Sequence, residues 1–111
     1  MVEEMNCCSS LGSASLILEE ARATAAVLKA LGDPQRLRMV NLLATSSEPV
    51  CVCEITAAVD LAQPTVSFHL KKLVSVGLLR REQRGTWAYY SIDEEALDRM
   101  ADAMHLRKEV S

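Results

Sequence analysis

Four cysteines are the residues of this chain best suited to chemistry, and they come as two close pairs. Cys7 and Cys8 are adjacent, while Cys51 and Cys53 are separated by one residue in the stretch PVCVCEI. Thiolates are soft ligands, and soft ions select them over carboxylate or imidazole groups. In a chain that stays in a reducing compartment, such cysteines indicate a metal site or reactive thiols more often than structural disulfides.

The start of the sequence bears on that compartment. MVEEMNCCSS is acidic and is not followed by an apolar segment, so it does not resemble a secretion signal. The sequence also has no uninterrupted apolar run of about 18 residues, the length that would indicate a membrane span. We therefore expect a cytoplasmic protein.

The spacing of the second thiol pair raises a geometric problem. The sequence predicts a short helix from about Val50 to Val59, which would carry Cys51 and Cys53 in its first turn. Each residue of a helix turns by about 100°, so these two side chains would point about 200° apart. An ion that captured both sulfur atoms would have to fray or bend the helix. Two other interpretations stay open: buried cysteines that only pack, and a pair that cross-links as a redox switch.

The other elements follow from apolar periodicity and from the residues that begin and end helices. Apolar residues recur every three or four positions from Ala14 to Leu31, and Gly32 then favours a helix end. Asp33 and Pro34 are typical of a helix start, which predicts a second helix to about Ala44 with Leu37, Val40, Leu43 and Ala44 inward.

The middle of the chain reads as two helices joined by a tight turn. After a loop at 45–49 and the short helix, DLAQ at 60–63 is the turn, and Pro64 opens a helix that ends near Gly77. Two helices connected in this way form a helix-turn-helix unit. Beyond it, strands near Leu79–Glu82 and Trp87–Ile92 predict a β-hairpin whose turn lies at 83–85.

Asp93 is predicted to cap a last helix through roughly His105. The expected fold is mainly α with a small β-hairpin, a winged helix-turn-helix that forms a homodimer through its terminal helices. We expect a mobile thiol-bearing arm at 1–13 and one DNA-binding and dimerisation domain at 14–111.

Charge is unevenly distributed along the chain. The net charge is −3, but the stretch from Leu61 to Tyr90 carries five basic residues and one acid, +4, which leaves −7 for the remainder. A local basic face matters more for phosphate contacts than the total charge does. This asymmetry favours double-stranded DNA as a partner.

The helix from Pro64 to Val76 is the candidate reader of the major groove, which admits one helix. Its apolar stripe faces inward, so the exposed candidates for base contacts are Gln63, Thr65, Ser67, Phe68 and His69. The candidates for phosphate contacts are Lys71, Lys72 and, at the hairpin tip, Arg84, with Arg36 or Arg38 as further possibilities. His69 could equally be a packing histidine, and Trp87, Tyr89 and Tyr90 favour packing within the hairpin.

Enzyme chemistry finds little support in the sequence. It contains no Cys-x-x-Cys, no Ser-His-Asp set and no Gly-rich phosphate loop. A regulator that binds DNA is the better interpretation.

Four stretches together resemble the ArsR/SmtB family of metal-responsive transcriptional repressors. They are LKALGDPQRLRMVNLL (28–43), VCVCEI (50–55), LAQPTVSFHLKKLVSVGLL (61–79) and RREQRGTWAYYSI (80–92). The resemblance implies a homodimeric winged-helix protein that binds operator DNA and dissociates when a toxic metal or metalloid binds. The cysteine pair at the start of the helix-turn-helix is similar to that of the arsenic-sensing and cadmium/lead-sensing branches.

What the resemblance implies about ligands is an arsenic(III) site, with Cd(II), Pb(II) or Sb(III) as further inducers. Arsenic(III) takes three thiolates, so Cys51 and Cys53 would need Cys7 or Cys8, reaching across from the other chain. An alternative set is Cys7 and Cys8 with one thiol of the other pair. Thr56 stands where arsenic sensors often have a third cysteine. Asp93, His105 and Glu109 only partly match the second, zinc-type site of some members.

Overall fold

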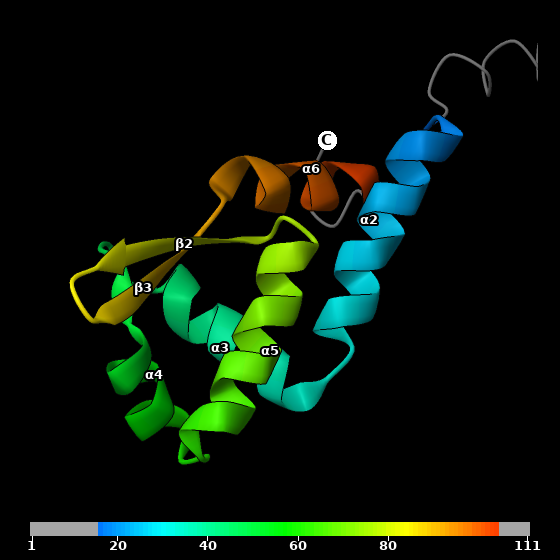
Figure 1. Ribbon diagram of the computed structural model, residues 1–111. Helices are drawn as coiled ribbons and strands as arrows, with labels where there is room; N and C mark the ends of the chain where they lie inside the picture. Colours follow the sequence, from blue (N-terminus) through cyan, green and yellow to red (C-terminus); the bar gives the residue numbers. More distant parts are fainter. Residues whose placement is uncertain (1–15, 105–111) are drawn as a thin grey trace, which may run out of the picture.

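A computed structural model describes residues 16–104 of the chain. The helices are α2 (Leu18–Leu31), α3 (Pro34–Ala44), α4 (Val52–Val59), α5 (Gln63–Ser75) and α6 (Glu94–Met104), and the strands are β1 (Val50–Cys51), β2 (Leu79–Arg84) and β3 (Trp87–Ile92). Outside the described residues lie the predicted arm at 1–13 and four residues named above: Cys7, Cys8, His105 and Glu109. The prediction of a mainly helical winged helix-turn-helix is confirmed (Figure 1).

Local signals set the start of α3 and the end of α4 close to where the sequence predicted them. Asp33 Oδ1 accepts hydrogen bonds from the backbone N–H groups of Gln35 (2.8 Å) and Arg36 (3.2 Å), and Pro34 follows in the first turn. Helix α4 ends at Asp60, which has a left-handed backbone with φ of 57°. Helix α5 then starts at Gln63, one residue before the predicted start.

The sheet has one strand more than predicted. Its order is β1-β3-β2, and all pairs are antiparallel. The prediction that the helix starts at Val50 is wrong, because Val50 and Cys51 pair with Tyr90 and Tyr89 of β3. An unpaired edge of β3 offers backbone partners that a local sequence pattern cannot reveal, and the helix therefore begins only at Val52.

The hairpin turn also differs from the prediction. Strand β2 continues to Arg84, so the turn consists of Gly85 and Thr86 rather than residues 83–85. Gly85 has a φ of +62°, and a glycine at the first central position is typical of a two-residue type II′ turn. The side-chain amide of Gln83 donates to the carbonyl of Gly85 over 3.0 Å, which supports the turn.

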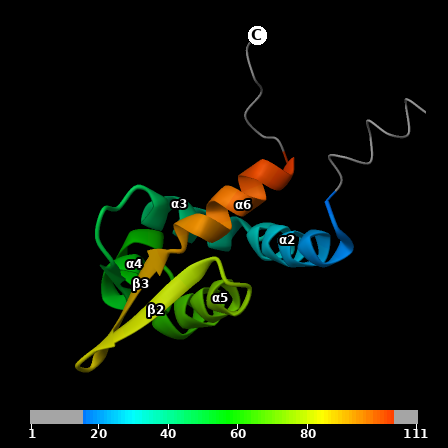
Figure 2. The ribbon, with the colours of Figure 1, turned by 90° about the horizontal axis from the view of Figure 1, so that it is seen from above.

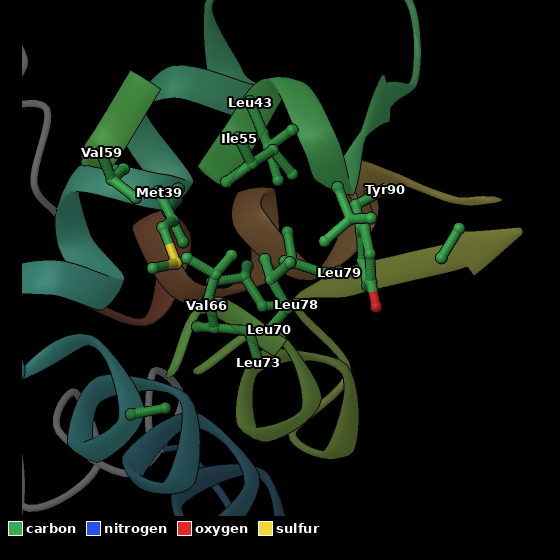
Figure 3. Packing of buried hydrophobic residues seen from close by; sticks show 14 of the residues in the cluster. Met39, Leu43, Ile55, Val59, Val66, Leu70, Leu73, Leu78, Leu79 and Tyr90 are labelled. Carbon is green, nitrogen blue, oxygen red and sulfur yellow. The ribbon is translucent and has the colours of Figure 1, made fainter. Parts of the chain in front are cut away.

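The core lies where the helices meet the sheet (Figure 3). From α5, Val66, Leu70 and Leu73 are completely buried, as the apolar stripe predicted. They meet side chains from four other elements: Met39, Leu43, Ile55, Val59, Leu79 and Tyr90, with Leu78 just before β2. Helix α5 is thus held in place by the apolar side chains on its inner face. Its outer face stays accessible to a partner.

Helix α3 is rotated relative to the prediction. Leu37 was expected inward, but its exposed fraction is 54%, and Ala44 is exposed as well. Met39, which is fully buried, takes the inner position together with Val40 and Leu43. A helix turns by about 100° per residue, so two positions of difference are enough to move a side chain from the core to the surface.

Helices α2 and α6 lie against each other at the end of the domain opposite the hairpin tip (Figure 2). This end is unusually apolar for a surface. Its exposed large apolar side chains are Leu16 (45%), Ile17 (59%), Leu18 (64%), Leu28 (37%) and Met104 (42%). Within residues 16–104, no helix combines the length and the apolar character needed to cross a membrane.

Candidate functional site

Cys51 and Cys53 converge instead of diverging. Cys51 is the N-cap of α4 and keeps an extended backbone (φ −65°, ψ 141°), so the helical angle of about 200° does not apply. Its Sγ accepts a hydrogen bond from the backbone N–H of Cys53 over 3.3 Å, and the two Sγ atoms are 2.7 Å apart. The prediction that one ion must fray the helix to reach both thiols is therefore wrong.

The carboxylate of Glu54 completes this helix start. Glu54 Oε1 accepts from the backbone N–H of Cys51 over 3.2 Å, which gives a capping box with a thiol in place of the usual hydroxyl. The side chain of Cys51 is buried, with 5% exposed, while Cys53 is exposed. One thiol is therefore anchored between strand and helix, and the other is open to an incoming ion.

The pKa of Cys53 depends on the neighbouring thiol of Cys51. Their mutual hydrogen bond, followed by desolvation, raises the pKa of Cys53 above its ordinary value. A thiophilic ion binds the thiolate, so it must displace this proton. With a metal–sulfur bond of about 2.3 Å, two sulfur atoms on one tetrahedral ion lie roughly 3.8 Å apart, so Cys51 and Cys53 would have to move apart from 2.7 Å to share an ion.

A complete metal centre needs more ligands than these two. Between residues 16 and 104 there is no group of three or more His, Cys, Asp or Glu side chains that could hold a metal ion. The predicted contribution of Cys7 and Cys8 lies outside the described residues and stays a prediction.

The outer face of α5 and the hairpin enclose a hollow with a volume of about 470 Å³. Gln63, Ser67 and Lys71 line it from α5, one helical turn apart from each other. Arg81 and Gln83 line it from β2. Polar and basic side chains thus converge from two elements, an arrangement suited to a nucleic-acid backbone and to base edges.

Phe68 and Lys72 form a second exposed stripe on α5. Phe68 has an exposed fraction of 54%, and the Nζ atom of Lys72 lies 5.4 Å from the centroid of its ring. Thr65 is exposed as well. The side chains that the sequence singled out for base contacts are therefore accessible, with the exception of His69.

His69 is half-buried and faces α3. Its Nδ1 accepts a hydrogen bond from Arg36 Nε over 3.2 Å, and Arg36 Nη1 donates to the carbonyl of Ala30 over 3.1 Å. This bond favours the packing interpretation of His69. Arg38 Nη1 donates to the carbonyl of Val59 over 3.3 Å, although Arg38 is exposed.

Arg84 lies at the end of β2 and folds back onto the sheet. Its Nη2 is 3.1 Å from Glu82 Oε1, and its guanidinium carbon is 4.4 Å from the centroid of the Tyr89 ring. The hydrogen bond to Glu82 raises the pKa of Arg84. The guanidinium is thus held by neighbours next to the hairpin tip and still half-exposed.

Sequence reasoning missed Arg81 and Gln83 as members of this surface. The two residues alternate with Glu82 along β2 and therefore share one face of the sheet, which the period of a strand could have indicated. Trp87 was expected to pack within the hairpin, but 46% of it is exposed and it lines the same hollow.

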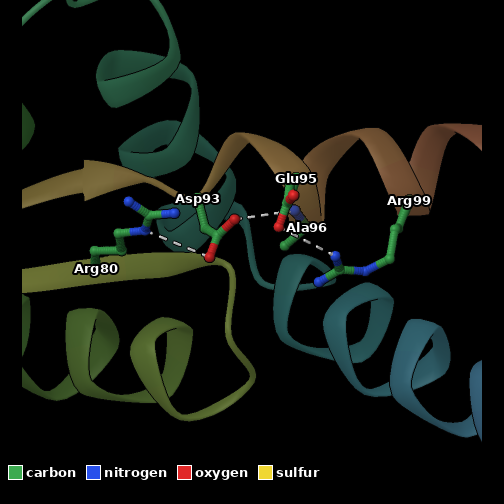
Figure 4. Close-up of polar contacts among 5 residues, drawn as sticks. All are labelled: Arg80, Asp93, Glu95, Ala96 and Arg99. Carbon is green, nitrogen blue, oxygen red and sulfur yellow. Dashed lines mark hydrogen bonds and ion pairs between the residues drawn. The ribbon is translucent and has the colours of Figure 1, made fainter.

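Asp93 is engaged in the fold rather than open to a metal (Figure 4). Its Oδ1 accepts from the backbone N–H of Ala96 over 3.1 Å, and its Oδ2 is 3.5 Å from Arg80 Nε. The bond from Ala96 and the charge of Arg80 lower the pKa of Asp93. The other two members of the second site, His105 and Glu109, lie outside the described residues.

Residues 33–81, which span α3, α4, α5 and the start of the hairpin, match the model of the bacterial regulatory protein, arsR family. The chain is 35% identical over 89 residues to the putative arsenical resistance operon repressor ArsR2 of Halobacterium salinarum, covering 79% of this chain and 72% of that protein. The chain belongs to the arsR family.

Other relatives are named for resistance to arsenic or to cadmium. The chain is 42% identical over 78 residues to the arsenic resistance transcriptional regulator ArsR1 of Pseudomonas putida, covering 70% of this chain but only 59% of that protein's length. It is 30% identical over 84 residues to a homologue of the cadmium resistance regulatory protein CadC of Staphylococcus aureus, covering 76% of this chain and 69% of that protein.

The fold agrees with a solved arsR-family structure. A winged helix-turn-helix DNA-binding domain from Mycobacterium bovis, described as homodimeric and as a possible ArsR-family regulator, has a TM-score of 0.66 and 30% identity. The match covers 84% of this chain and 88% of that one. Membership in the arsR family makes this chain a regulatory protein and not an enzyme.

Proposed function

We propose that this chain is a metalloid-responsive transcriptional repressor, which binds operator DNA as a homodimer and dissociates when its cysteine thiolates bind arsenic(III). The observation that carries this proposal is the 2.7 Å contact between the sulfur atoms of Cys51 and Cys53. The contact lies where the sheet that carries the hairpin meets the first helix of the helix-turn-helix. An ion that binds there touches β1 and α4, which pack against β3 of the hairpin and against α5.

The hollow between α5 and the hairpin supports the DNA half of the proposal. Gln63 and Ser67 can contact base edges, since a glutamine amide pairs with adenine and a hydroxyl accepts several partners. Lys71 and Arg81 supply the positive charge that phosphates require. Thr65, Phe68 and Lys72 extend the contact along the exposed side of α5.

The exposed apolar side chains of α2 and α6 support the dimer. Leu28 lies on α2 and Leu16, Ile17 and Leu18 lie at its start, and all four side chains are exposed. Burial of such a surface by a second copy would place two recognition helices on one face of the DNA, as dimeric helix-turn-helix proteins require. The relative from Mycobacterium bovis is described as homodimeric, which supports a dimer for this chain as well.

Arsenic(III) is the inducer we favour for the thiol pair. It takes three thiolates, so Cys51 and Cys53 would act with Cys7 or Cys8, in a protein that we place in the cytoplasm. The relatives named for arsenical resistance agree with this choice. Sb(III) has the same preference for sulfur.

A second candidate within the same fold is a repressor that responds to Cd(II) or Pb(II). These soft ions could use all four thiols, and the Staphylococcus aureus relative is named for cadmium resistance. The 2.7 Å contact between the sulfur atoms also agrees with a third candidate, a redox sensor that forms a Cys51–Cys53 disulfide.

The first testable prediction is release of operator DNA by arsenite. In a mobility-shift assay with a duplex selected from a random library, a small excess of arsenite should release the reduced wild-type protein. Cys51→Ser with Cys53→Ser should abolish the response but keep DNA affinity, because serine is also a good N-cap and preserves the start of α4.

Two comparisons separate the candidates. Cys7→Ser with Cys8→Ser should weaken the arsenite response without changing DNA affinity, and an unchanged response would remove the N-terminal thiols from the site. Release by cadmium but not by arsenite would assign the second candidate. Release that needs peroxide and is reversed by dithiothreitol without any metal would assign the redox sensor.

A further inference from the structure

Strand register places one thiol of the pair in a row of side chains that crosses the sheet. Cys51 on β1 lies directly opposite Tyr89 on β3, and Tyr89 in turn lies opposite Glu82 on β2. Residues directly opposite each other in a sheet project from the same face and contact each other. Cys51, Tyr89 and Glu82 therefore form one row across three strands.

Arg84 continues this row toward the tip of the hairpin. It lies two residues after Glu82 on the same strand, so its side chain projects from the same face. Its guanidinium pairs with Glu82 at 3.1 Å and lies 4.4 Å from the centroid of the Tyr89 ring. The opposite face of β2 carries Arg81 and Gln83, which line the hollow beside α5.

An ion at the thiol pair must act on this row. Cys51 Sγ now accepts from the backbone N–H of Cys53, and an ion bound by that sulfur competes with this bond. Cys51 is 5% exposed and is the last residue of β1, so a displaced sulfur would press on the side chains packed around it, which the strand register expects to include its neighbour on β3. That neighbour is Tyr89.

We propose that Tyr89 is a positioning residue that connects the thiol pair to Arg84, so that ion binding at Cys51 and Cys53 changes how the hairpin presents this arginine. In the structure, the Tyr89 ring and Glu82 hold the guanidinium half-exposed beside the hairpin tip. If the Tyr89 ring is displaced, it no longer holds the guanidinium, and Arg84 loses its fixed position on the hairpin. The proposal rests on the proposed function of a thiol-dependent DNA-binding regulator. Coupling between two sites requires an element that has two arrangements and is influenced by both sites. Here that element is the hairpin with Arg84, and the two sites are the thiol pair and the DNA-binding surface.

The only tryptophan of the sequence provides a probe that does not need DNA. Trp87 lies directly opposite Arg84 and is 46% exposed, so its fluorescence reports on the hairpin next to the guanidinium. In the full-length reduced protein, titration with cadmium chloride should change Trp87 emission in parallel with sulfur–metal absorption. Tyr89→Phe keeps the ring and should behave as the wild type. Tyr89→Leu should retain the absorption but lose the change in emission.

DNA binding gives the second measurement. The measured quantity is the DNA dissociation constant with the ion divided by that without it. In Tyr89→Leu this ratio should be smaller than in the wild type by about tenfold or more, within the range of typical coupling. In Tyr89→Phe it should keep the wild-type value. Arg81→Gln is the matched control, because it removes a cation from the other face of β2. It should weaken DNA binding equally with and without the ion.

The outcomes distinguish this proposal from the proposed function. Equal emission changes in Tyr89→Leu and the wild type, or no change in the wild type, would overturn the role of Tyr89. In the wild type, the ion could instead change Trp87 emission but leave the affinity for DNA unchanged. That result would contradict the proposed function and leave the connection through Tyr89 supported.

Discussion

At the scale of single residues, Gln63 and Lys71 share one stripe of α5 but would serve different parts of a DNA contact. Both line the hollow beside the hairpin, and both are exposed. A lysine ammonium is a point charge suited to phosphate, which carries no sequence information. A glutamine amide can pair with one base and so reads sequence. Affinity and specificity should therefore separate between these two positions.

The prediction for Lys71 concerns salt dependence. Lys71→Ala should weaken binding to all duplexes alike and lower the slope of log affinity against log salt by about one, because one fewer counterion is released. Fluorescence anisotropy at several salt concentrations measures both quantities. Gln63→Ala is the comparison, and it should keep the slope while losing discrimination at one base pair. A Lys71→Ala protein with an unchanged slope would remove this residue from the phosphate contacts.

At the scale of elements, the helix starts determine where the functional side chains lie. Asp33 caps α3, Cys51 caps α4 and Asp93 caps α6, each through a side-chain atom that accepts a backbone hydrogen bond. Two of these caps are carboxylates, while the third is the thiol of the candidate metal site. The functional pair is thus part of the structure of α4, which makes helix geometry and ion binding interdependent.

The prediction for Asp33 concerns acid stability. The backbone N–H of Arg36, and to a smaller degree that of Gln35, lowers the pKa of Asp33. A carboxylate with a lowered folded-state pKa contributes stability above its unfolded pKa of about 3.9, and this contribution is lost as the pH falls through the folded value. Asp33→Ala should therefore lower Tm by roughly a few degrees at neutral pH, with the difference from wild type shrinking below about pH 4.

Asparagine at the same position is the matched control for the cap. Asp33→Asn keeps a good N-cap that does not titrate, so its Tm at neutral pH should stay close to wild type. Thermal unfolding followed by circular dichroism from pH 7 to pH 3 compares the three proteins, a range chosen around the carboxylate pKa of about 3.9. A constant difference between Asp33→Ala and wild type across that range would contradict the role of the carboxylate charge.

At the scale of the whole molecule, the domain has a basic, hollowed end and an apolar end. The hairpin and α5 form the first, whereas α2 and α6 form the second (Figures 1 and 2). A large cluster of exposed apolar side chains on a protein surface usually marks an interaction site. A second copy on the apolar end would leave both basic ends free for DNA.

The prediction for Leu28 tests the dimer. Leu28→Glu places a charge on the apolar side of α2 and should shift the protein from dimer to monomer, as light scattering after size-exclusion chromatography would measure. DNA affinity should then fall by about 100-fold, because two linked half-site contacts become one. Ala26→Glu introduces the same charge on the opposite side of the helix and should remain dimeric. A dimeric Leu28→Glu protein would exclude this surface.

Much of the fold could be predicted from local signals. Asp33 with Pro34, the turn at residue 60 and the buried stripe of Val66, Leu70 and Leu73 each lie where the pattern indicated. These signals act within a few residues through caps, backbone angles and helical period, so a single sequence contains them. The order of these signals indicated a winged helix-turn-helix. The inward apolar stripe of α5 indicated that Gln63 and Ser67 are exposed, as they are.

By itself, then, the sequence determined the order and approximate extent of the helices, which thiols exist and where positive charge gathers. Tertiary structure decided the geometry of the site. Cys51 is extended and not helical because β3, almost forty residues later, offers it a strand partner, and this pairing brings its sulfur against that of Cys53. The partners of His69 and Arg84 depend likewise on elements distant in the chain or on another strand. Such contacts are decided by packing between elements, which local periodicity does not encode.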